Sequence, residues 1–206
     1  MKFNYRKAYQ PLLALSACLF PFFSYASLMQ IQHNLAIFPL FQCEFSQTRQ
    51  LKEMNLNLQS SGEFILSQQK GVIWQQTAPF PQTIVMTEKQ IYQSVMGAVQ
   101  IISAKDQPQL FHFTQLMSDI LQGNWQALGD YFILQSQPAQ ESGWQVLLTP
   151  KKSPFQQIFN QITLTGDKII KSVLIQDKQG DNTHLQFQHC KALKTLTDEQ
   201  EKLLAQ

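Results

Sequence analysis

The stretch GEFILSQQKGVIWQQTAPFPQTIVMTEKQIY, residues 62–92, decides the fold because its side chains alternate between two kinds. Large apolar side chains share the even-numbered positions Phe64, Leu66, Val72, Trp74, Ile84 and Met86. Many odd-numbered positions are polar: Glu63, Ser67, Gln75, Thr83 and Thr87. Because successive residues of a strand point to opposite faces, the stretch predicts strands of a sheet with one apolar face. That face is either an ordinary core wall or the lining of an apolar cavity.

Further strands are predicted on both sides of this stretch. Apolar alternation or short apolar runs between turn residues mark 41–52, 91–94 and 99–103, and later 131–136, 144–149, 161–165, 169–177 and 184–190. Residues 54–61 are predicted to be a strand end or a loop. Ile65, Ile73 and Val85 interrupt the polar face, so we expect loops or helices to cover part of the outside.

Helical spacing replaces this alternation at both ends and in the middle of the chain. The apolar positions are Leu28, Ile31, Leu35 and Phe38 in a first helix, and Phe113, Leu116, Met117, Ile120 and Leu121 in a middle helix that ends at Gly123. Asn124 is suited to cap a second middle helix from Trp125. Thr197 and Gln200 match a capping box at the start of a last helix.

These elements predict an α+β fold. Helices inserted between two groups of antiparallel strands are expected to lie over the concave face of a strongly twisted sheet, where they act as a lid or plug.

The first 26 residues have the pattern of an export signal. Lys2, Arg6 and Lys7 precede an acid-free apolar run over residues 12–25, and small side chains stand at Ser24 and Ala26. We therefore expect a signal peptide over residues 1–26 and a single domain over residues 27–206.

A lipobox is the alternative interpretation of the same segment. Leu15-Ser16-Ala17-Cys18 would leave Cys18 acylated as the first residue of the mature chain. Cleavage after Ala26 is favoured because the apolar run continues past Cys18.

The charge balance argues against a nucleic-acid partner. The chain has 16 basic and 14 acidic residues, and residues 1–26 hold three of the basic and none of the acidic ones, which leaves 13 against 14 and a net charge of −1. Nucleic-acid phosphates require clustered Lys and Arg side chains, which this composition does not provide.

Patterns of catalysis and metal binding are not found in the sequence. His33, His112, His184 and His189 lack metal-ligand spacing, and the last two are expected on opposite faces of one strand. Ser60-Ser61-Gly62 does not fit the nucleophile frame Gly-x-Ser-x-Gly, and there is no phosphate-binding loop. Asp177 and Asp181 fall in turns and are expected to be solvated. We therefore predict that the protein is not an enzyme and holds no metal or cofactor.

Several motifs occur in the order and spacing of a known family. They are Phe41-x-x-x-Phe45-x-Gln47, Gly62-Glu63-Phe64, Trp74 with Pro79 five residues later, Ile84-Val85, the apolar middle helix, Leu147-Leu148-Thr149-Pro150, and a strand-Gly-strand unit around Ile175 and Leu185. Together they resemble the LolA family of periplasmic carriers of outer-membrane lipoproteins, over essentially the whole expected mature chain.

The resemblance implies an unclosed β-barrel with helices across its mouth, whose cavity shields the acyl chains of lipoproteins. The implied acyl-binding residues are Phe64, Leu66, Val72, Trp74, Ile84 and Met86, and the implied lid residues are Phe113, Leu116, Met117 and Ile120. The implied partners are a lipoprotein or lipid cargo, inner-membrane release machinery and an outer-membrane acceptor. We expect a monomer in the periplasm of a Gram-negative bacterium, or a lipid-anchored protein of the outer membrane if Cys18 is acylated.

The chain departs from the family pattern in three places. Gln68 occupies the position of an Arg that holds the helical lid shut in the family; because Gln has no charge, we expect a weaker latch. Val72 replaces a common aromatic residue, and Thr87-Glu88 replaces an Asp-Gly turn. These departures suit a divergent member whose cargo is a lipoprotein or another lipid, such as a glycolipid or a lipid-linked pigment.

Cys43 and Cys190 are the cysteines that remain after cleavage at Ala26. In an exported protein they suggest a disulfide between the first and last strands, with two buried free thiols as the alternative.

Two other functions fit the same fold. One is an outer-membrane lipoprotein receptor with an acylated Cys18, and the other is a sensor or scaffold that binds a protein through the concave face.

Overall fold

The structure is a computed structural model that describes residues 28–205 except 36–37, 88, 104 and 138–142. The expected signal peptide over residues 1–26, Cys18 and Glu88 lie outside the described residues.

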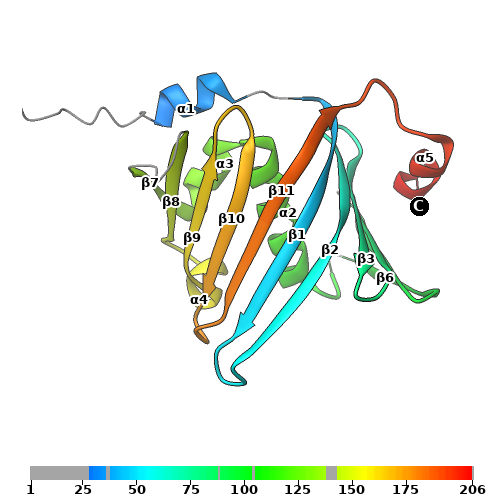
Figure 1. Ribbon diagram of the computed structural model, residues 1–206, viewed down its shortest axis with the longest axis horizontal. Helices are drawn as coiled ribbons and strands as arrows, with labels where there is room; N and C mark the ends of the chain where they lie inside the picture. Colours follow the sequence, from blue (N-terminus) through cyan, green and yellow to red (C-terminus); the bar gives the residue numbers. More distant parts are fainter. Residues whose placement is uncertain (1–27, 36–37, 88, 104, 138–142, 206) are drawn as a thin grey trace, which may run out of the picture.

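In the described part of the chain, eleven strands form one antiparallel sheet in the order β6-β5-β4-β3-β2-β1-β11-β10-β9-β8-β7 (Figure 1). The strands are β1 Leu40–Leu51, β2 Leu56–Ser67, β3 Gly71–Ala78, β4 Gln82–Met86, β5 Gln90–Val95, β6 Ala98–Ser103, β7 Phe132–Gln137, β8 Trp144–Pro150, β9 Phe159–Gly166, β10 Ile170–Asp177 and β11 Asn182–Ala192. Because the edge strands β6 and β7 do not pair with each other, the curved sheet is an open barrel. The predicted fold is confirmed.

The helices are α1 Leu28–Asn34, α2 Pro108–Gln122, α3 Trp125–Tyr131, α4 Phe155–Ile158 and α5 Asp198–Leu204. Gly123 ends α2 in the left-handed conformation with φ 63°, and the Asn124 side chain accepts a hydrogen bond from the backbone N–H of Ala127 at the start of α3. Both helices lie on one side of the curved sheet, as Figure 1 shows, and buried residues of each belong to the main core. In the described residues, no helix has the length and apolarity needed to cross a membrane.

The C-terminal helix α5 covers part of the outer face of the sheet. Leu204 packs in one cluster with Ile65, Ile73 and Val85, the residues that interrupt the polar face of the alternating stretch. The predicted capping box starts α5, because Thr197 accepts from the Gln200 backbone N–H and the Gln200 side chain accepts from the Thr197 backbone N–H.

A disulfide joins β1 to β11 inside the curved sheet. Cys43 and Cys190 are 147 residues apart in sequence, and their Cα atoms lie 4.1 Å apart. The pairing register between β1 and β11 shifts between Gln42 and Glu44, on either side of Cys43. Opposite this point in β11, His189 has φ 49°. This β-bulge adds one residue to β11, so that Cys190 instead of His189 faces inward. His189 therefore faces outward, where its Nδ1 lies 2.8 Å from Glu44 Oε2.

The bulge makes one expectation from the sequence wrong. His184 pairs with Thr48, an outward-facing residue of β1, and His189 contacts the outward-facing Glu44. Both histidines thus lie on the outer face, because the additional residue between them reverses the alternation.

Of the two interpretations of residues 54–61, the strand end is confirmed for Leu56 onward, because β2 begins at Leu56 and pairs with the end of β1. Two further features differ from the expectations. The short helix α4 was not predicted. Asp181 is not solvated: only 7% of it is exposed, and its carboxylate accepts hydrogen bonds from the Arg49 side chain at 3.2 Å and the Lys52 backbone N–H at 3.0 Å.

Removal of the disulfide is expected to destabilise the fold. Replacing Cys43 and Cys190 with Ala should lower the free energy of unfolding by about 2–4 kcal/mol, because the unfolded chain loses a long cross-linked loop. Urea denaturation of the double variant measures this change. In the unaltered protein, two more thiols per chain should react after reduction than before; an equal count would contradict the disulfide.

The packing of α5 gives a second prediction. Leu204→Ala should lower the free energy of unfolding by about 2 kcal/mol, because it leaves a space above Ile73 and Val85. Lys202→Ala, an exposed change on the same helix, is the control and should have little effect. If both variants unfold at the same urea concentration, α5 does not contribute its apolar face to stability.

Candidate functional site

Cross-strand pairing sorts the inward-facing residues of β1 to β6 into rows, because directly paired residues share one face of a sheet. The first row is wholly apolar: Phe41, Leu66, Val72, Met86, Ile91 and Ile102. The second contains Cys43, Phe64, Trp74, Ile84, Gln93 and Gln100. The third contains Phe45, Gly62, Gln76, Gln82, Val95 and Ala98. The inner face therefore changes from apolar side chains to amides along the strands.

A cavity of about 290 Å³ lies between this inner face and α2. The sheet contributes Val72, Trp74, Ile84, Met86 and Ile91, and α2 contributes Leu110, Phe113, Met117 and Leu121. Ligand pockets in proteins have volumes of about 300–1,000 Å³, so the volume of this cavity is just below that range. It is large enough for part of an apolar ligand while α2 remains in place.

The residues expected at the site divide into two groups. Those that line the cavity are Val72, Trp74, Ile84, Met86, Phe113 and Met117. Those that pack in the main core are Phe64, Leu66, Leu116 and Ile120, each no more than 3% exposed. In the second group, Phe64 and Leu66 lie beside the cavity wall, since they pair directly with Trp74 and Val72 on the same face.

Aromatic packing holds Trp74 in position at the cavity wall. Its ring stacks on Phe45 with the ring centroids 3.9 Å apart and lies nearly parallel to Phe64 at 5.7 Å. Phe64 in turn meets Phe187 of β11 edge to face at 5.3 Å. The pairing of β1 with β11 thus brings an aromatic residue from the C-terminal half of the chain to support the cavity.

Several lining residues were not identified from the sequence. Four of them are amides, Gln47, Gln76, Gln82 and Gln93, and Leu185 comes from β11. Gln76 and Gln82 share the even-numbered positions of Trp74 and Ile84, so strict alternation places them on the inner face. The position of Leu185 at the cavity depends on the pairing register of β11 with β1, which the sequence alone does not specify.

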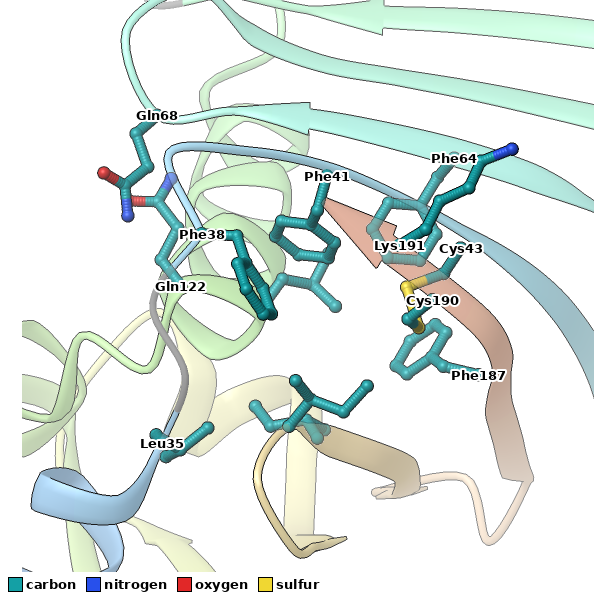
Figure 2. Close-up of a pocket in the computed structure, with 13 residues that line it drawn as sticks. Leu35, Phe38, Phe41, Cys43, Phe64, Gln68, Gln122, Phe187, Cys190 and Lys191 are labelled. Carbon is teal, nitrogen blue, oxygen red and sulfur yellow. A yellow bond between two sulfur atoms is a disulfide. The ribbon is translucent and has the colours of Figure 1, made fainter. Parts of the chain in front are cut away.

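A second, smaller pocket of about 30 Å³ lies at the C-terminal end of α2 (Figure 2). Phe64, Phe187 and the disulfide line it, together with Gln68 and with Gln122, the last residue of α2. Figure 2 shows the side chains of Gln68 and Gln122 close together at its rim. Gln68 therefore lies at the C-terminal end of α2.

Charged groups are excluded from the larger cavity. Among the described residues that line it, none has an ionisable side chain. Burial raises the pKa of Asp119 on α2, partly offset by hydrogen bonds from Asn124 and Gln115, and the Lys171 side chain lowers the pKa of Asp167; neither carboxyl lines the cavity. In the part of the chain that the structure describes, no three His, Cys, Asp or Glu side chains group as metal ligands would.

Solved structures with similar folds include three that span most of this chain. A LolA superfamily protein from Nitrosomonas europaea is 11% identical, with 85% of this chain and 96% of that chain covered and a TM-score of 0.46. The MucA/MucB complex from Pseudomonas aeruginosa is 14% identical, with 84% of this chain and 58% of that chain covered and a TM-score of 0.40. LprF from Mycobacterium bovis is 11% identical, with 85% of this chain and 99% of that chain covered and a TM-score of 0.38.

The family assignment depends on the sequence and not on these structural similarities. No curated protein sequence matches the chain significantly. Residues 39–202 match the family described as outer membrane lipoprotein carrier protein LolA, and this range covers β1 to β11 and most of α5. The chain therefore belongs to the LolA family, whose members are described as carriers.

Proposed function

We propose that this protein is a periplasmic carrier that shields the acyl chains of a lipoprotein, or of another lipidated cargo, and passes them toward the outer membrane. The main support is the cavity of about 290 Å³, because sheet residues and α2 residues expected to bind and cover acyl chains line it together. Membership of the LolA family gives independent support. In this proposal residues 1–26 are an export signal, and inner-membrane release machinery and an outer-membrane acceptor are the partners.

The driving force for binding is the removal of hydrocarbon from water. Each buried CH₂ contributes about 0.8 kcal/mol, so an acyl chain of ordinary length can offset the opening of the helical lid, α2 and α3. When the cavity is empty, Phe113 and Met117 of α2 remain against the same apolar wall. The free and loaded forms therefore differ little in free energy, and cargo can move to a tighter acceptor without chemical energy.

Gln68 is the proposed latch between the sheet and the lid. It lines the small pocket with Gln122 at the C-terminal end of α2, where the helix dipole carries partial negative charge. A neutral amide interacts with that charge less strongly than a guanidinium would. The lid of this protein should therefore open at a lower cost than one held by Arg.

Acidic substitutions test the cavity. Trp74→Glu and Ile84→Glu should each weaken the binding of the uncharged fluorescent probe N-phenylnaphthylamine by at least about tenfold, because a carboxylate would enter the apolar wall. The control is Ile101→Glu, which makes the same change at a residue of β6 that is 60% exposed. Circular dichroism confirms that each variant is folded. Unchanged probe affinity in folded Trp74→Glu and Ile84→Glu would contradict the proposal.

A basic substitution tests the latch. Gln68→Arg should reduce the affinity for the same probe by about two- to fivefold, because a cation near the C-terminus of α2 stabilises the closed lid by about 0.3–1 kcal/mol. Gln69→Arg adds the same charge one residue further along the turn and should have a smaller effect. Equal effects of the two variants would assign the change to net charge and remove the latch role from Gln68.

A further inference from the structure

Amide side chains gather at one end of the cavity. Gln76, Gln82 and Gln93 lie on neighbouring strands of the sheet, and Gln47 lies on β1 opposite Ser60. The opposite end is formed by the apolar row that contains Val72, Met86 and Ile91. The lining of the cavity thus changes from apolar to polar along the direction of the strands.

These amides keep unused hydrogen-bonding capacity. Gln76 Nε2 donates to the Phe80 carbonyl at 3.0 Å, which leaves its Oε1 as an acceptor. Within the described residues, the side chains of Gln47, Gln82 and Gln93 have no hydrogen-bond partner, although each is only partly exposed. The buried hydroxyl of Ser60, which lies opposite Gln47, also has no hydrogen-bond partner among the described residues. The Ser60 hydroxyl is buried and therefore loses free energy without a partner, whereas the three half-buried amides can bond to water or exchange that water for a ligand.

Among the described residues that line the cavity, none carries a positive charge to receive an anion. Arg49 is the next inward-facing residue of β1 after Gln47, but its guanidinium pairs with the Asp181 carboxylate at 3.2 Å. The side chains with free capacity are neutral, and a phosphate placed beside them would lose water without gaining a cation. Ester and amide carbonyls and hydroxyl groups, by contrast, match what a carboxamide donates and accepts.

We propose that Gln47, Gln76, Gln82 and Gln93 form a subsite that selects cargo whose acyl chains join an uncharged hydrogen-bonding head, and that disfavours anionic lipids. This inference rests on the proposed acyl-binding function of the cavity. Two sources share the required chemistry: the acylated end of a lipoprotein, with its glyceryl esters and amide, and a neutral glycolipid.

Competition for a bound probe tests the selection. The purified protein is loaded with N-phenylnaphthylamine and titrated with three lipids that each carry two palmitoyl chains, in the same non-ionic detergent. The lipids are an N-acetylated dipalmitoyl-S-glycerylcysteine amide, a galactosyl dipalmitoylglycerol and dipalmitoylphosphatidylglycerol. At least one neutral lipid should displace the probe at about tenfold lower concentration than the anionic lipid, as expected for one or two additional neutral hydrogen bonds. The neutral lipid that displaces at the lower concentration identifies the source.

Matched variants connect the selection to the amides. In Gln82→Leu/Gln93→Leu the ratio between neutral and anionic lipids should fall to within about twofold, and the affinity for the apolar probe should increase because the cavity lining becomes more apolar. Gln75→Leu removes an amide from the outer face of β3, next to Gln76, and should keep the ratio of the unaltered protein.

The possible results separate this inference from the proposed function. Equal or stronger displacement by the anionic lipid, or an unchanged ratio in the double variant, would overturn the subsite while leaving the acyl-binding cavity intact. Failure of all three lipids to displace the probe would overturn the acyl-binding function itself.

Discussion

The pairing of the first strand with the last is the constraint on which the rest of the structure depends. Because β1 pairs with β11, the strands before and after the α2–α3 segment form one sheet and not two. The shared sheet curves around α2, so that residues from both halves meet at one apolar face. Trp74 is held by Phe45 and, through Phe64, by Phe187, and the disulfide fixes β1 to β11 at the same level. The cavity lies between α2 and the sheet that this pairing completes, and Leu185 of β11 is one of its lining residues.

Local patterns were sufficient to predict most of the strands and helices, whereas the unclosed barrel was expected from the family resemblance. Alternation over residues 62–92 identified the inner face, and the interruptions at Ile65, Ile73 and Val85 indicated a cover that proved to be α5. Gly123, Asn124 and Thr197 marked helix ends correctly because capping depends on residues close in sequence. Each of these signals is a short-range preference that tertiary packing reinforces.

The features that were missed or left open depend on partners distant in sequence. Leu56 and Leu58 are 45% and 48% exposed, so the start of β2 owes its strand structure to pairing with β1 and not to burial. Asp181 is buried because Arg49, 132 residues away in sequence, reaches its carboxylate. The bulge at His189 moves Cys190 inward, which alternation from His184 could not anticipate. At the candidate site, the polar lining residues were not identified, although the even-numbered positions of Gln76 and Gln82 already indicated the inner face.

A carrier must bind its cargo strongly enough to keep it from water and weakly enough to release it. Apolar burial along Val72, Met86 and Phe113 grows with chain length but does not distinguish one lipid from another. A buried cation would distinguish lipids by charge, but breaking such a pair on release costs several kcal/mol. Neutral amides contribute about 1 kcal/mol each, because water can replace their bonds when the cargo leaves. In the proposed carrier, a group of glutamines beside an apolar wall would therefore add selectivity while it keeps release possible.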